Sequence, residues 1–277
     1  MLKLHQYYEK ILQETDLQQI IEINIPGADQ MVNFDTDSLT SMKEVIGIAL
    51  INPNPKTAGH GTLRLRIGDK EILPNDFHAD LITKFSHKEV DAKIEFAFKE
   101  YIFPVKTEAK GKPVKLEYVE PVNGNRGKLY LYLLGSKSSN SICIPKYRFQ
   151  VLDFTVPKNN SNKDIELDID ARTLQSHSKV VGAVFLGPSN RIKQVKLCVD
   201  ETSVFPEGMI GQLVTKEIVN TQTIGNGIFT KHIIPFTYML QACDLKARNS
   251  KIEGKLLVTP NPNEDYKVFL YLLTTIG

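Results

Sequence analysis

The sequence predicts an all-β chain made of two tandem eight-stranded jelly-roll β-sandwiches, a double jelly roll, with a short N-terminal helix. Two observations carry this prediction. The chain contains an internal repeat of about 130 residues, and each copy holds about eight short runs of alternating apolar residues separated by turn residues. Eight antiparallel strands in that length are typical of a jelly roll or another two-sheet sandwich. A short helical segment expected after the fourth strand favours the jelly roll.

The internal repeat consists of seven blocks that recur in the same order. The offset between copies drifts only from 131 to 139 residues, as small loop insertions would produce. The pairs are Ile21–Pro26 with Leu152–Pro157, Val45–Leu50 with Val180–Phe185, Leu63–Ile67 with Val195–Val199, Pro74 with Pro206, Leu81–Lys84 with Leu213–Lys216, Ile102–Pro104 with Ile233–Pro235, and Lys128–Leu134 with Lys267–Leu273. A gene duplication therefore explains the chain.

The strands are expected where apolar and polar residues alternate, because successive side chains of a strand point to opposite faces. In the first copy they are expected at 19–25, 31–37, 44–51, 62–67, 90–97, 98–105, 114–120 and 128–134. In the second copy they are expected at 148–156, 165–170, 179–186, 192–200, 217–223, 228–235, 252–259 and 267–274. Phe77 and Leu81 lie one helical turn apart after the fourth strand, and Met209 and Leu213 repeat that spacing.

An amphipathic helix is expected before the first strand, and only in the first copy. It presents one apolar stripe, at i, i+3, i+4, i+7 and i+8, formed by Leu4, Tyr7, Tyr8, Ile11 and Leu12. The stripe can pack on its own domain, or it can be an assembly interface that meets a neighbouring subunit or an inner layer. Both interpretations stay open at this point.

The domain boundaries follow from the repeat and from a polar run at 135–141. The expected division has four parts, which are the N-terminal helix at 1–18, the first jelly roll at 19–136, a linker at 137–147 and the second jelly roll at 148–277.

Composition bounds the possible functions. The chain has 277 residues and a formal net charge of +2, and no run of basic residues indicates contact with nucleic acid or a membrane surface. Three isolated cysteines, Cys143, Cys198 and Cys243, do not form a disulfide framework, and we expect reduced thiols, which favour assembly in a cytoplasm. The N-terminal residues lack the apolar stretch of a secretion signal.

Catalytic patterns are not found. The six histidines are scattered without a metal-binding spacing, and there is neither a glycine-rich phosphate loop nor a nucleophile elbow. We expect no catalytic residue, no cofactor and no enzyme activity.

Two pairs of acidic residues stand at corresponding places in the two copies. They are Asp35 with Asp37, and Asp168 with Asp170. Carboxylates two residues apart on a strand point the same way, so each pair is a weak candidate for Ca²⁺. Since a calcium site usually needs six or more oxygens, solvated carboxylates at a strand edge are the simpler interpretation.

With these features assembled, the chain resembles the major capsid proteins of the double jelly-roll lineage, found in tailless icosahedral viruses with internal membranes. It is most similar to the small bacteriophage members of the corticovirus and related single-stranded DNA phage type. The resemblance rests on the two copies, the short linker, the N-terminal helix, and the blocks Thr62–Asp69 and Gln194–Asp200, each followed by a short helix. It covers residues 20–277 and contains no diagnostic short motif.

The resemblance implies a structural protein that forms homotrimers, pseudo-hexameric capsomers and an icosahedral virion capsid, assembled in the cytoplasm of a host. It implies contacts with neighbouring capsomers, and with penton or minor capsid proteins and an internal membrane, but no direct contact with nucleic acid. The N-terminal helix would face the virion interior.

Two alternatives remain beside it. A secreted or cell-surface glycan-binding or glycan-processing protein can be built from two β-sandwiches, although the chain has no tryptophan for stacking on sugar rings. The other is a paired-domain adhesin or scaffold that builds no shell.

Overall fold

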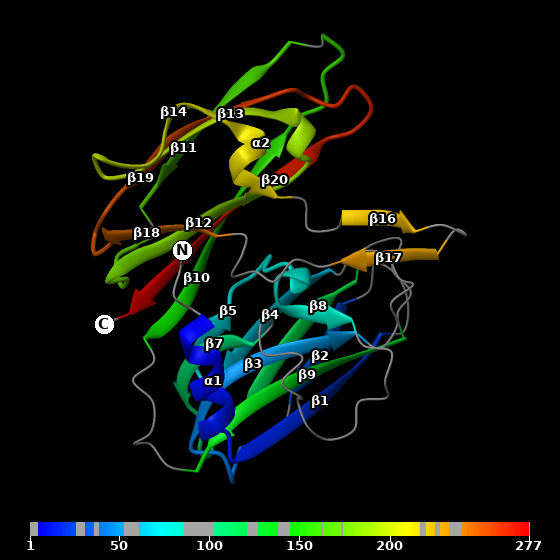
Figure 1. Ribbon diagram of the computed structural model, residues 1–277, viewed down its shortest axis with the longest axis vertical. Helices are drawn as coiled ribbons and strands as arrows, with labels where there is room; N and C mark the ends of the chain where they lie inside the picture. Colours follow the sequence, from blue (N-terminus) through cyan, green and yellow to red (C-terminus); the bar gives the residue numbers. More distant parts are fainter. Residues whose placement is uncertain are drawn as a thin grey trace. The chain divides into compact units, whose positions relative to one another are not determined.

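The computed structural model describes most of the chain (Figure 1). The described residues are 5–25, 31–35, 39–52, 61–85, 102–120, 127–137, 145–161, 163–172, 174–216, 220–224, 228–232 and 240–276. They divide between two compact units, one formed by 3–147 and 218–238, the other by 1–2, 148–217 and 239–277. Strands dominate both units, which confirms the all-β prediction.

The first sandwich begins with helix α1 (His5–Glu14) and contains two sheets. The β1 sheet has the order β1-β9-β3, with β6 and β7 both beside β3, and the β2 sheet has the order β2-β8-β4-β5. The strands are β1 (Leu17–Ile25), β2 (Met31–Asp35), β3 (Glu44–Asn52), β4 (Thr62–Ile67), β5 (Lys70–Leu73), β6 (Thr83–Phe85), β7 (Phe103–Glu108), β8 (Val114–Val119) and β9 (Gly127–Ser136), and the short helix η1 (Ala79–Ile82) precedes β6.

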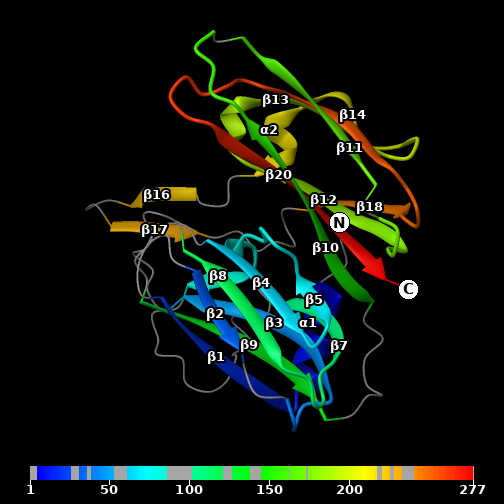
Figure 2. The same ribbon diagram turned by 180° about the vertical axis from the view of Figure 1, so that it is seen from behind.

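The second sandwich has the same plan, seen from behind in Figure 2. The β10 sheet has the order β10-β20-β12, with β15 and β18 both beside β12, and the β11 sheet has the order β11-β19-β13-β14. The strands are β10 (Lys146–Val156), β11 (Ile165–Ala171), β12 (Lys179–Leu186), β13 (Ile192–Val199), β14 (Thr202–Ile210), β15 (Thr215–Lys216), β18 (Gln241–Lys246), β19 (Ile252–Val258) and β20 (Tyr266–Ile276), with helices η3 (Ser189–Arg191) and α2 (Gly211–Val214).

The strand order identifies both sandwiches as jelly rolls. Leaving aside the short parallel strands β6 and β15, eight strands remain in each copy, and they fall alternately into the two sheets as the chain runs from its first strand to its fourth. The last strand of each copy inserts between the first and the third, and the second-to-last between the second and the fourth. This nested order is that of a double Greek key closed into two sheets. The double jelly-roll prediction is therefore confirmed by topology.

The duplication extends to local irregularities. Strand β3 carries a β-bulge between Val45 and Gly47, and β12 carries one between Val180 and Gly182, at an offset of 135 residues in each case. Past the bulge both strands gain a short parallel neighbour, with Leu50 facing Thr83 and Phe185 facing Thr215. Because bulges are specific local features that neither sheet order nor composition requires, their recurrence supports a common origin of the two copies.

Several strand predictions need correction. The predicted strands at 217–223 and 228–235 form a separate hairpin, β16 (Asn220–Ile224) and β17 (Ile228–His232), and take no place in the sandwich. Strands β5 and β14, which follow tight turns at Gly68 and Asp200, were not predicted, and neither was strand β18. Segment 90–97 lies outside the described residues. The predicted short helix exists in both copies, but it follows the fifth strand and not the fourth.

The proposed match of Ile102–Pro104 with Ile233–Pro235 is also wrong. Pro104 faces Gly47 across β7 and β3, whereas the residue that faces Gly182 is Ala242 on β18. The structural counterpart of Pro104 is therefore Ala242. The two isoleucine–proline segments matched only because their residue types are alike. The strand equivalent to β7 is β18, which lies further along the chain.

The core of the second sandwich joins its two sheets. Apolar side chains of the β10 sheet, such as Phe185 and Leu270, share one buried cluster with Leu197 and Leu256 of the β11 sheet. Phe185 and Phe205 lie with ring centroids 5.9 Å apart inside it. In the first sandwich, Leu63, Leu65 and Ile67 alternate with half-buried residues along β4. The side chains on one face of each sheet thus pack in the core.

Gly254 on β19 permits a close approach by β13. A Cβ atom built on Gly254 would lie 2.0 Å from the carbonyl oxygen of Lys196, and this contact is to backbone that cannot rotate away. We predict that Gly254→Ala lowers the free energy of unfolding by about 1–3 kcal/mol, because the strands must separate. Chemical denaturation of both proteins measures the difference.

Gly187 provides the matched control for this substitution. Its Cβ would meet its nearest neighbour at 3.4 Å, an ordinary contact, so Gly187→Ala should change stability little. Equal stability of the two variants would show that β13 does not press on Gly254.

Candidate functional site

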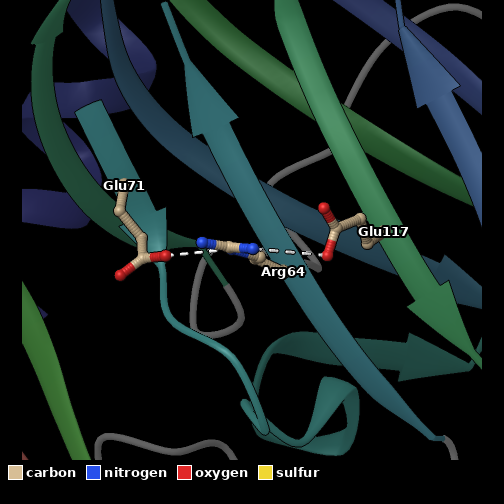
Figure 3. A network of polar contacts seen from close by, with 3 residues as sticks. All are labelled: Arg64, Glu71 and Glu117. Atoms are coloured by element: carbon tan, nitrogen blue, oxygen red, sulfur yellow. Dashed lines mark hydrogen bonds and ion pairs between the residues drawn. The ribbon is translucent and has the colours of Figure 1, made fainter. Parts of the chain in front are cut away.

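The outward face of the β2 sheet carries a network of opposite charges. Arg64 on β4 lies between Glu71 on β5 and Glu117 on β8, so that one guanidinium links three strands (Figure 3). Its Nε donates to Glu71 at 3.0 Å, and Nη1 lies 3.5 Å from Glu117. The hydrogen bond to Glu71 raises the pKa of Arg64 further. Lys115 and Asp35 add an ion pair at 3.6 Å between β8 and β2.

The outward face of the β11 sheet repeats this design with different residues. Lys196 on β13 pairs with Glu207 on β14 at 2.9 Å, and Lys255 on β19 pairs with Glu166 on β11 at 2.6 Å. The hydrogen bonds that Lys196 and Lys255 donate to these carboxylates raise the pKa of each lysine, and the bond from Lys196 lowers the pKa of Glu207. Each face is therefore a polar surface whose charges are largely compensated across neighbouring strands.

A hollow of about 480 Å³ opens on this face of the β11 sheet. Its lining contains five carboxylates, three lysines and no aromatic ring. The lining residues are Asp168, Ile169, Asp170, Lys196, Cys198, Asp200, Glu201, Lys251, Glu253, Gly254 and Lys255. Sugar rings usually stack on exposed aromatic side chains, so this hollow does not favour a glycan-binding function.

The acidic pairs from the sequence analysis lie on these two faces. Asp170 lies 3.2 Å from Lys251 Nζ, and Asp35 is paired with Lys115. Asp168 lines the hollow beside Asp170, whereas Asp37 lies outside the described residues. In the part of the chain that the structure describes, no group of three or more histidine, cysteine or acidic residues could hold a metal ion.

The correspondence between the two acidic pairs is shifted by two residues. In the first copy, Asp35 on β2 faces Lys115 on β8. The residue of the second copy that is equivalent to Asp35 is Asp170 on β11, which faces Glu253 on β19. Asp168 therefore corresponds to Asn33 and not to Asp35. The repeated carboxylate pair reflects chance placement on two polar strand faces.

The predicted N-terminal helix is present as α1, and three side chains of its apolar stripe are described, those of Tyr7, Ile11 and Leu12. Ile11 is fully buried, and its Cγ2 lies 3.0 Å from the position a Cβ would take on Gly47. Tyr7 and Leu12 are half-buried, Leu4 lies outside the described residues, and the side chain of Tyr8 is not described. Ile11 thus anchors the helix on β3 of its own sandwich, at the bulge. An assembly role of the stripe remains a prediction.

Cys198 and Cys243 are free, and burial raises the pKa of Cys243 to about 11, while Cys143 lies outside the described residues. Among the residues with a described position, no helix combines the length and apolar character needed to cross a bilayer.

The Arg64 network should contribute modestly to stability. Replacing Arg64 with Gln removes two partly exposed ion pairs, and such pairs are worth about 0.2–1 kcal/mol each. In double-mutant cycles monitored by denaturation, we expect a larger coupling energy for Arg64 with Glu71 than with Glu117, because the first contact is shorter. Lack of coupling to either glutamate would contradict the network.

Comparisons with known proteins give structural likenesses only. No family model and no curated protein matches the chain. Among solved structures, it is similar to the major capsid protein P2 of bacteriophage PM2, with 12% identity, a TM-score of 0.44, and coverage of 94% of this chain and 98% of that one.

Two other capsid structures are also similar. For the major capsid protein of STIV the identity is 10% and the TM-score 0.37, with 94% and 97% of the two chains covered. For VP54 of PBCV-1 the values are 9% and 0.40, with 93% of each chain covered. Scores this low carry no argument alone, and the assignment of the fold to the double jelly roll rests on the strand order described above.

Proposed function

We propose that the chain is a structural protein, the major capsid protein of an icosahedral virion, and that it forms homotrimers that act as pseudo-hexameric capsomers. One observation carries the proposal, namely that a single chain holds two jelly rolls with the same strand order, the same bulge and the same short parallel strand. Two of the solved structures to which it is similar are viral major capsid proteins.

A threefold symmetric assembly would make use of the duplicated domain. A threefold arrangement of chains with two similar domains places six similar domains around one axis. Such a block has a nearly hexagonal outline and can be surrounded by six others. A duplicated sandwich is therefore suited to tiling a closed shell with one kind of chain.

The surface chemistry fits repeated polar contacts. Charges on the outward faces are compensated within each sheet, as in the Arg64 network and the Lys196–Glu207 pair, and the net charge of the whole chain is only +2. Copies of a strongly charged chain would repel one another when packed in a shell. In this proposal the contacts are with neighbouring capsomers, with penton or minor capsid proteins and with an internal membrane, and none is with the genome.

The mass of the protein in solution tests the trimer. Three chains of 31.2 kDa give 3 × 31.2, about 94 kDa, and we predict a stable species of this mass by light scattering. A clean monomer over the micromolar range would contradict the capsomer. Hexagonal particles in negative-stain images would give independent support.

The half-buried Leu12 of α1 tests the assembly role of the helix. Leu12→Ser should reduce the yield of assembled particles while the trimer stays folded, because the fully buried Ile11 still anchors the helix on Gly47. The control is Gln13→Ser on the exposed side of α1, which should assemble normally. Equal yields from both variants would remove the helix from the assembly interface.

A further inference from the structure

A buried polar cluster holds the end of the last strand in the second sandwich. His177 is 8% exposed, and its Nδ1 lies 2.6 Å from Oγ1 of Thr274, which is fully buried. The Thr274 hydroxyl donates to the backbone carbonyl of Arg148 at 2.9 Å. His177 precedes β12, Thr274 belongs to β20 and Arg148 to β10, so the cluster joins three elements.

The geometry fixes the tautomer of the imidazole. A hydroxyl has one proton, and Thr274 gives it to a carbonyl oxygen that can only accept. Nδ1 of His177 must then donate to Thr274, which leaves Nε2 without a proton in the neutral ring. A second proton at Nε2 would place a positive charge in a buried site.

The charged groups around His177 oppose that second proton. Burial lowers the pKa of His177, and the positive charge of Arg148 on β10 lowers it further. On the other packed elements, Lys179 and Asp244 pair with each other at 2.8 Å at the surface. Other charged residues of the adjoining segments are exposed, and they include Lys146, Arg172, Lys246 and Arg248.

The first sandwich supplies an apolar version of the same site. The backbone bond from Lys43 N to Ser136 O has its counterpart in the bond from Ser178 N to Thr275 O. By this correspondence, Met42 in the first copy is equivalent to His177 in the second, and Gly135 is equivalent to Thr274.

Packing confirms that the two sites are equivalent. Met42 is 3% exposed, and its Cγ lies 2.2 Å from where a Cβ of Gly135 would be. It fills the space that the Thr274 side chain takes in the second copy. Leu17, which faces Gly135 across β1 and β9, stands where the repeat places Arg148. None of the three residues at these places, Leu17, Met42 and Gly135, has a titratable side chain.

We propose that the cluster of Arg148, His177 and Thr274 is an acid-sensitive clamp, which loosens the attachment of the segment 174–178 to the end of β20 when His177 takes up a proton. The first sandwich, with Leu17, Met42 and Gly135 in these places, keeps its attachment. Acid therefore acts on one of two otherwise similar domains. The inference stands independently of the proposed capsid role.

The direction of the pH effect follows from linkage. A histidine in the unfolded chain binds a proton below about pH 6.5, while the folded site resists it. The unfolded or locally open state thus holds more protons in acid, and the stability contributed by the neutral cluster is complete above that pH and declines below it.

Hydrogen exchange of the full chain tests the clamp. After correction for the intrinsic pH dependence of exchange, the protection factor of the Ser178 amide should be several-fold lower at pH 5 than at pH 7.5. The matched internal control is the Lys43 amide in the first sandwich, which makes the equivalent bond and should show no such change. An equal response of both amides would overturn the proposal.

Substitution of the histidine isolates its contribution. His177→Asn places an amide N–H near the position of Nδ1, where it can donate to Thr274, and it cannot titrate, so it should abolish the extra exchange at pH 5. A folded His177→Asn protein that keeps the acid response would contradict the clamp. If this variant fails to fold, titration of the His177 ring by NMR in the unmodified protein decides, since an unlowered pKa would refute the proposal.

Discussion

The fold depends on the burial of one face of each sheet, with a register that the alternation of side chains fixes. Because side chains alternate with a period of two, a shift of one residue in the pairing of β4 with β8 would turn Leu65 and Leu116 out of the core and toward the outward face. The same constraint acts on the pairing of β13 with β19. The bulge at Val45 and Gly47, and its counterpart in β12, then let one central strand serve two partners on the same side, β7 and β6 in the first copy. The sheet order follows from these pairings.

Much of the fold could be predicted from alternation and repetition, and the misses have physical reasons. Strand β5 has only four residues, too few to show a pattern. Strand β14 contains Pro206 and Gly208, which normally argue against a strand, but it lies at the edge of its sheet, where a proline costs no ladder bond. In the sequence, β16 and β17 resemble two strands of the sandwich, because an alternating pattern predicts a strand but does not predict the sheet to which that strand belongs.

The site was less predictable than the fold, because it depends on pairings between distant residues. Acidic pairs such as Asp168 and Asp170 stand out in the sequence, yet the lysine at 3.2 Å from Asp170 is 81 positions further along the chain (251 − 170). Arg64 and its partner Glu117 are likewise joined only by the pairing of β4 with β8. His177 and Thr274 carried no motif. Aligning the two copies at Met42 and Gly135 would have marked them as a divergent pair, but only once the register was known.

The two sandwiches share their main-chain pairings but differ in side chains at equivalent places. The backbone bond from Lys43 N to Ser136 O recurs at the second site as the bond from Ser178 N to Thr275 O. Side chains at the same places have changed from apolar to titratable. In a shell built from such chains, every capsomer would alternate domains with and without a histidine clamp. A pH change would then weaken three positions of the six, which permits local loosening without loss of the whole block.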